Sequence, residues 1–116
     1  MNETILYISK SEQDIQKFLY YIQRRVEKNR KNYTHFTDKH EDVLKTENFD
    51  IIGKSVYGNR LGAGYGYCLY YCFSSNFDKN KYNEMENKKI EQILMHTREG
   101  AREISELDIL YMLGLV

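Results

Sequence analysis

The densest group of potential ligand-contacting residues lies in a glycine-rich stretch, residues 58–66. Four of these nine residues are glycine, and Asn59 and Arg60 add hydrogen-bond donors. The GxGxG spacing fits neither the dinucleotide fingerprint nor the P-loop, and a strand rather than a helix is expected to follow it. Glycines such as Gly62 and Gly64 let a backbone approach a ligand and direct N–H groups at an anion. The stretch predicts a binding loop, with a long hairpin connection as the alternative.

Two arginines four residues apart form a second candidate site. Arg98 and Arg102 are expected on a helix, where such a pair lies about 6 Å apart on one face. That arrangement suits a pyrophosphate, because each guanidinium group binds phosphate oxygens bidentately. The alternative is a solvated face on which the arginines pair with nearby glutamates, a kind of pair that contributes little.

Aromatic side chains crowd the segment that follows the glycines. Tyr65 and Tyr67, nearest the glycine-rich stretch, are predicted to stack on a base or to contact ribose or phosphate through their hydroxyl groups. The other rings of this segment, Tyr70, Tyr71 and Phe73, are expected in the core or in an interface.

The remaining chemistry-bearing residues favour structural roles. Cys68 and Cys72, on one face of an expected strand, would lie about 13 Å apart, too far for a disulfide. No further ligands accompany them at zinc spacing, so packed thiols are predicted. His35 and His40 lie among acidic residues, where a solvated loop is favoured over a metal site. We therefore expect no catalytic residue, no metal and no cofactor.

Hydrophobic periodicity predicts the elements that would position these groups. Strands are expected at residues 4–8, 49–57 and 65–74, and helices at 12–30, 80–98 and 105–113. Ser11 with Asp14, and Ser105 with Asp108, have capping-box spacing at two helix starts. Residues 32–48 are expected to form a loop, and residues 58–64 to close a hairpin. The order β-α-β-β-α-α predicts an α+β fold, a small antiparallel sheet with helices packed on one face.

Length, charge balance and the distribution of apolar residues exclude several classes of protein. The 116 residues fit a single domain, 1–116, and 17 basic residues balance 17 acidic ones. This balance argues against strongly basic nucleic-acid binders and acidic DNA mimics, so no nucleic acid is expected as a partner. No apolar run reaches the length of a transmembrane helix or a signal peptide, so a cytoplasmic protein without membrane contact is predicted. The apolar segment 109–116 predicts a homodimer or a multiple of one.

In its size, in its richness in Lys, Asn, Ile and Tyr, and in the pair Arg98 and Arg102, the chain resembles phage anti-Thoeris nucleotide sponges. The resemblance implies a non-enzymatic phage or prophage protein in the host cytoplasm. Such a protein sequesters a nucleotide-type immune signal, similar to cyclic ADP-ribose, without turnover. The alternative is a protein–protein inhibitor of a host defence enzyme such as a CRISPR nuclease, using its tyrosine-rich face. A small enzyme built on His35 and His40 is a third interpretation.

Overall fold

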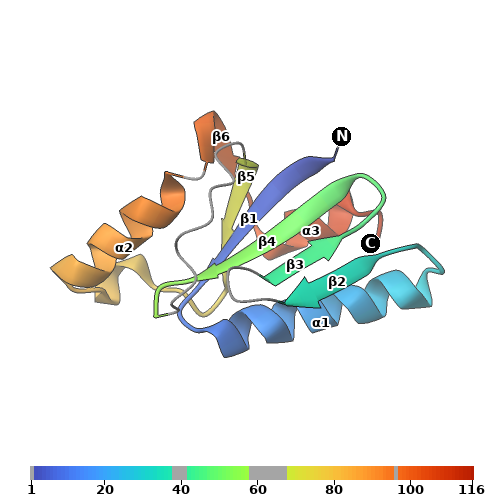
Figure 1. The fold of residues 1–116 in the computed structure, drawn as a ribbon, viewed down its shortest axis with the longest axis horizontal. Coiled ribbons are helices and arrows are strands. Elements are labelled where there is room, and N and C mark those ends of the chain that lie inside the picture. The colour runs from blue at the N-terminus through green and yellow to red at the C-terminus, as the bar shows by residue number, and fades with distance from the viewer. Residues whose placement is uncertain (1, 38–41, 58–67, 96) are drawn as a thin grey trace.

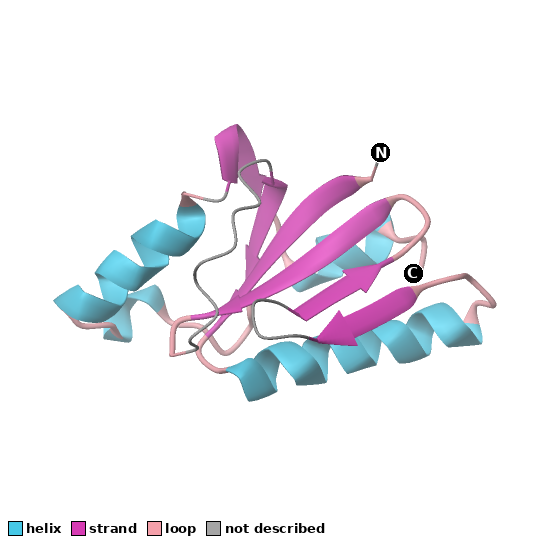
Figure 2. Ribbon diagram, in the orientation of Figure 1, coloured by secondary structure: helices cyan, strands magenta, loops and turns pink. Residues whose placement is uncertain are grey.

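The computed structural model describes residues 2–37, 42–57, 68–95 and 97–116. In this part of the chain, a six-stranded sheet is combined with three α-helices and a short 3-10 helix (Figure 1, Figure 2). The elements in chain order are β1 (Glu3–Ser9), α1 (Glu12–Lys28), β2 (Thr34–Thr37), β3 (Asp42–Lys45), β4 (Phe49–Ser55), β5 (Cys68–Phe73), η1 (Lys79–Lys81), α2 (Glu84–Leu94), β6 (Thr97–Glu103) and α3 (Glu106–Met112). The expected α+β class is confirmed.

β1 lies inside the sheet, whose strand order is β2-β3-β4-β1-β5-β6. It pairs in parallel with β4 and β5, and β5 pairs in parallel with β6, whereas β3 is antiparallel to both β2 and β4. The apolar run from Ile5 to Ile8 suits this position, because both faces of an inner parallel strand are covered, and none of the four side chains is more than 2% exposed. The sheet is therefore mixed, and the expectation of an antiparallel sheet is corrected.

The expected hairpin between the strands now assigned as β4 and β5 is also wrong. The two strands lie on opposite sides of β1, and both run parallel to it. A tight turn cannot join parallel strands, so the chain between them is a crossover connection. Residues 58–67, which fall in this connection, lie outside the described residues.

Alternate residues of β1 belong to two separate cores. Ile5 and Tyr7 are in the core that includes residues of α1 and α3, whereas Leu6 and Ile8 are in the core that includes residues of α2. Successive strand residues point to opposite faces of a sheet, so the helices cover both faces. Figure 1 shows α2 at one end of the molecule, away from α1 and α3. The expectation that all helices share one face is wrong, because an apolar stripe does not specify which face of a sheet it covers.

α1 begins as its sequence predicts and packs closely on β4. The Oγ of Ser11 accepts a 3.3 Å hydrogen bond from the N–H of Asp14, and the predicted apolar stripe is buried (Ile15, Phe18, Leu19, Ile22, Val26). The Asp14 carboxylate does not complete a capping box, because its Oδ2 accepts instead from the hydroxyl of Ser9 at 3.2 Å. A Cβ built on Gly53 would lie 2.2 Å from Cγ2 of Ile15, so glycine at this position allows the close approach.

Three strands appear where other structures were expected. β2 and β3 occupy parts of the predicted loop 32–48, and α2 ends at Leu94, so Thr97 and Arg98, which were expected at the end of this helix, belong to β6. β6 is irregular: Cys68 pairs with Thr97, but Tyr70 pairs with Arg102. Gly100 lies between the paired residues with a φ of +80°, a conformation that favours glycine.

The apolar C-terminal segment packs into the protein's own core. Ile109, Leu113 and Leu115 are each at most 7% exposed, and all three belong to the core that includes α1. Arg25 donates to the carbonyl of Leu115 at 2.6 Å, and Lys31 donates to the carbonyl of Leu113 at 3.0 Å. These three side chains are therefore covered within the chain, whereas Val116 at the end of the segment is 63% exposed. The homodimer stays a prediction. The predicted capping box of Ser105 and Asp108 is confirmed.

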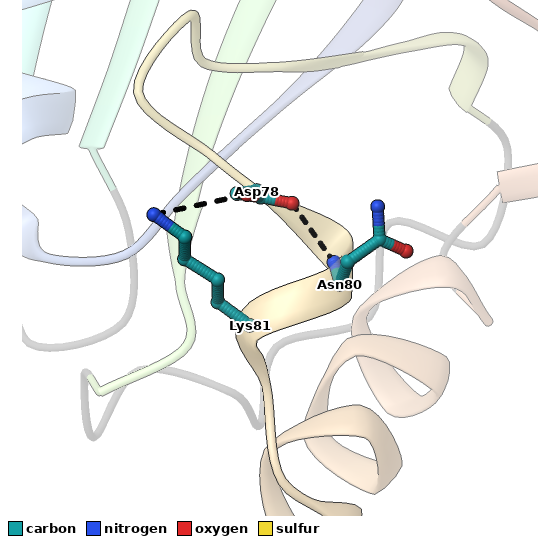
Figure 3. A network of polar contacts seen from close by, with 3 residues as sticks. All are labelled: Asp78, Asn80 and Lys81. Atoms are coloured by element: carbon teal, nitrogen blue, oxygen red, sulfur yellow. Dashed lines mark hydrogen bonds and ion pairs between the residues drawn. The ribbon is translucent and has the colours of Figure 1, made fainter.

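The connection from β5 to α2 is stabilised by local caps. The Asp78 carboxylate accepts a 3.0 Å hydrogen bond from the N–H of Asn80, and Nζ of Lys81 lies 3.9 Å from its other oxygen (Figure 3). Asn83 and Glu86 form a capping box at the start of α2. These contacts satisfy N–H groups at helix starts and lie on the surface.

Candidate functional site

A cleft of about 210 Å³ opens at the carboxyl ends of β1 and β5, beside the first turns of α1 and α3. Open sheets with parallel strands commonly bind ligands at this edge, where connections leave neighbouring strands in different directions. The cleft is lined by Tyr7, Asp14, Lys17, Phe18, Tyr21, Ser74, Ser75, Asn76 and Glu106.

Glu106 is fixed on the wall of this cleft by two donors. Its Oε1 accepts a 2.7 Å hydrogen bond from the hydroxyl of Tyr7 and a 3.1 Å hydrogen bond from the N–H of Ser75. The Tyr7 ring is itself fixed, because it stacks on Phe18 with 4.0 Å between ring centroids and 4° between planes. The carboxylate is thus held at the junction of β1, β5 and α3.

A second carboxylate, that of Asp14, is joined to the ends of the two strands. The Ser9 hydroxyl lies 3.2 Å from Oδ2 of Asp14 and 3.3 Å from the hydroxyl of Ser74. Ser9 and Ser74 are 0% and 6% exposed, so they support the floor of the cleft rather than reach into it. The cleft therefore presents carboxylate acceptors, which suit a ligand that donates several hydrogen bonds.

The phenol of Tyr7 remains protonated over the physiological range. Burial raises its pKa well above the usual value of 10, and the neighbouring Glu106 carboxylate raises it further. A protonated hydroxyl can donate to Glu106, whereas a phenolate would repel that carboxylate. The hydrogen bond between the two side chains is consequently stable toward pH changes near neutrality.

A larger hollow of about 530 Å³ adjoins the cleft on the outer surface of α1. The two share Lys17 and Tyr21, and the hollow adds Gln13, Gln16, Tyr20 and Arg24. Tyr20 and Tyr21 are 54% and 46% exposed, so two neighbouring aromatic side chains are accessible on this surface. A ligand in the cleft can therefore extend over aromatic rings and cations.

The two cysteines lie in different cores, which corrects the expectation that they share one face. Cys72 belongs to the core that includes α1, and Cys68 to the core that includes α2. Burial raises the pKa of Cys68 to about 11 and that of Cys72 to about 12. Both are therefore neutral thiols near pH 7, and neither is poised as a nucleophile.

The sequence-predicted site divides between two regions. Asn59, Arg60, Gly62, Gly64, Tyr65 and Tyr67 lie outside the described residues. Arg98 and Arg102 are on β6, with exposed side chains, so the helical i,i+4 arrangement is wrong. They lie on an edge strand of the sheet, and neither lines the cleft or the adjoining hollow.

His35 packs at the opposite side of α1 from the cleft. Its Nδ1 lies 2.7 Å from Oε1 of Gln23, and its buried Nε2 has no hydrogen-bond partner among the described residues. Within the same part of the chain, no group of three or more His, Cys, Asp or Glu side chains could hold a metal ion. His40 lies outside the described residues.

The residues of the cleft were missed because they lie far apart in the sequence. Tyr7 and Glu106 are separated by 99 positions, and Ser9 and Ser74 by 65. No local pattern marks these residues, because the parallel pairing of β1 with β5 that brings them to one edge of the sheet is itself a long-range feature.

Among the described residues, no helix is long and apolar enough to cross a membrane. Comparison of the chain with protein-family models, with curated proteins and with solved structures found no match. The residues of the cleft are therefore the basis for a functional proposal.

Proposed function

We propose that this protein binds a small nucleotide-type ligand without chemical turnover, with the ribose in the cleft between β1, β5, α1 and α3. The observation that carries the proposal is the carboxylate of Glu106, fixed by Tyr7 and Ser75 on the wall of that cleft. A second carboxylate, that of Asp14, lines the same cleft. Vicinal hydroxyl groups of a ribose donate to such acceptors, as they do in dinucleotide-binding folds.

Size and surroundings favour a nucleoside over a bare sugar. The cleft of about 210 Å³ is smaller than the 300–1,000 Å³ of typical pockets for whole small molecules, so it suits one ring of a larger ligand. Tyr21 lies on its rim with a half-exposed ring, which offers a surface on which a base can stack.

Binding without turnover agrees with the chemistry of the described side chains in the cleft. The hydroxyl groups of Ser9 and Ser74 are buried and engaged with each other. The phenol of Tyr7 is held in its neutral form by burial, which raises its pKa. We propose sequestration of a nucleotide-type immune signal by a phage or prophage protein as the biological role, in keeping with the resemblance to nucleotide sponges.

The proposal is tested by calorimetric titration of nucleosides, nucleotides and ADP-ribose-type compounds against the wild type and Glu106→Gln. We expect micromolar binding by the wild type and at least tenfold weaker binding by the variant, because the amide loses an acceptor and the charge that strengthens hydrogen bonds. Glu99→Gln, on the exposed edge strand β6, is the matched control and should bind as the wild type. Chromatography of the ligand recovered after incubation with the protein should show the starting compound, because binding without turnover leaves the ligand chemically unchanged. A wild type that binds none of these compounds would refute the proposal.

A second candidate function, inhibition of a host enzyme by protein–protein contact, is favoured by the exposed Tyr20 and Tyr21. Exposed tyrosines are frequent anchors of such interfaces. Under this alternative, a partner enzyme would raise the thermal stability of the protein, and nucleotides alone would have no effect.

A further inference from the structure

We infer that the outer surface of α1 is a second subsite of the same ligand, which holds two linked phosphate groups between Lys17 and Arg24. This inference rests on the proposed function and makes it more specific. The ligand class becomes a nucleoside carrying a pyrophosphate, bound with its ribose toward Glu106 and its phosphates over α1.

Continuity of the surface is the first argument. The hollow on α1 shares Lys17 and Tyr21 with the cleft that contains Glu106. All of its lining residues belong to α1, so it is an open helix face that can accommodate groups extending out of the cleft. A ligand anchored by its ribose thus has a direct path to this surface.

Charge is the second argument. Between Ile15 and Val26 the chain contains cations and no acidic residue, so the middle of α1 offers phosphates an attractive potential. The cleft differs, because two carboxylates, those of Asp14 and Glu106, line it and attract hydroxyl donors, and its single cation, Lys17, lies on the border that it shares with the hollow. The cleft therefore suits the neutral ribose, which donates hydrogen bonds, and the surface of α1 suits the anionic phosphates. This difference sets the orientation in which the ligand binds.

Geometry on the helix is the third argument. Lys17 and Arg24 are seven residues apart, almost two full turns, so both project from one face with about 10.5 Å of rise between them. Both side chains are exposed, and each is long enough to reach toward the middle of that interval. The half-exposed Tyr21 and the amide groups of Gln13 and Gln16 lie on the same hollow and add stacking and hydrogen-bonding groups. A single phosphate would engage one cation well, whereas two linked phosphates can engage both.

The test compares the four common ribonucleosides with their 5′-monophosphates and 5′-diphosphates by calorimetry at low salt. We expect the diphosphate of the preferred base to bind the wild type at least tenfold more tightly than its nucleoside, about 1.4 kcal/mol. In Arg24→Ala, a residue that lines the hollow but not the cleft, this advantage should fall below about threefold, while affinity for the nucleoside changes little, because the variant removes a charged contact to the phosphates and leaves the ribose site intact. Lys28→Ala, an exposed cation at the end of the same helix, is the control and should keep the full advantage.

Two outcomes would overturn the inference and leave the proposed function standing. The first outcome is equal affinity of the wild type for a nucleoside and for its diphosphate, together with weaker binding of both compounds by Glu106→Gln. The other is loss of the diphosphate advantage in Arg98→Ala/Arg102→Ala but not in Arg24→Ala, which would assign the phosphates to β6. Absence of binding for every compound would refute the proposed function itself.

Discussion

The hydroxyl of Tyr7 donates a 2.7 Å hydrogen bond to Oε1 of Glu106, and thereby joins an inner strand to the first residue of α3. The same oxygen of Glu106 also accepts a hydrogen bond from the N–H of Ser75, which follows β5. Three elements that are distant in the sequence are thus held by one carboxylate.

Replacement of Tyr7 by Phe tests this junction. The ring can keep its stacking on Phe18, but Glu106 loses its shortest hydrogen bond. We expect a loss of about 1.5–3 kcal/mol in the free energy of unfolding, the range for a hydrogen bond to a charged group. Urea unfolding at neutral pH measures it. Tyr111→Phe, at a side chain that is 61% exposed, is the control and should change stability by less than about 0.5 kcal/mol.

Stability should fall at alkaline pH because of the buried thiols. In the unfolded chain Cys68 and Cys72 ionise near pH 8.5, whereas burial holds their folded-state pKa at about 11 and about 12. A raised folded-state pKa means that the unfolded state releases protons first, so the free energy of unfolding falls as pH rises above about 8.5. The slope contributed by each thiol is at most about 1.4 kcal/mol per pH unit.

This dependence is measured by urea unfolding under reducing conditions between neutral pH and pH 10.5. In Cys68→Ala/Cys72→Ala the curve should be flatter, although the whole curve should lie lower because two buried side chains are truncated. Equal slopes in the variant and in the wild type would show that the thiols do not cause the alkaline loss.

Gly53→Ala should destabilise the contact between β4 and α1. The added Cβ would lie 2.2 Å from Cγ2 of Ile15, which forces the helix or the strand to move. We expect a cost of about 1–3 kcal/mol from overpacking. In the background of Ile15→Ala, which removes Cγ2, the same substitution should cost much less. A double-mutant cycle measures this coupling, and additive effects would contradict the steric explanation.

The contact between α1 and the C-terminal segment should control local opening of that segment. Arg25→Met removes the 2.6 Å hydrogen bond to the carbonyl of Leu115 and keeps much of the aliphatic packing. We expect faster hydrogen exchange at the amides of Leu113 and Leu115, which bond to Ile109 and Leu110 within the same segment. Lys28→Met, on the same helix, should leave both exchange rates unchanged.

Local sequence signals predicted the features of this fold that depend on neighbouring residues. The N-cap of α1 at Ser11 and the capping box of Ser105 and Asp108 both follow from patterns a few residues long. The inner strand β1 was identified for the same reason, since its four consecutive apolar residues are typical of a buried strand.

Features set by distant contacts were mispredicted. β1 separates β4 from β5, and nothing in the segment between the two strands indicates that a third strand lies between them. β6 contains the sequence Thr-Arg-Glu-Gly-Ala-Arg-Glu, whose charged residues favour a helix, and it becomes a strand through its pairing with β5. The cleft was missed on the same grounds, because Tyr7 and Glu106 meet only once the sheet and α3 are assembled.

The inner position of β1 also has a consequence for biosynthesis. During translation this strand leaves the ribosome before both of its neighbours. Ile5 pairs with Ile51 and Tyr70, which follow it by 46 and 65 positions and are synthesised later. Until then both of its edges are open, and pairing over such separations is slow. The nascent chain thus exposes an apolar edge for the time needed to synthesise more than half of the protein, so its yield in cells should depend on chaperones more than on the stability of the finished fold.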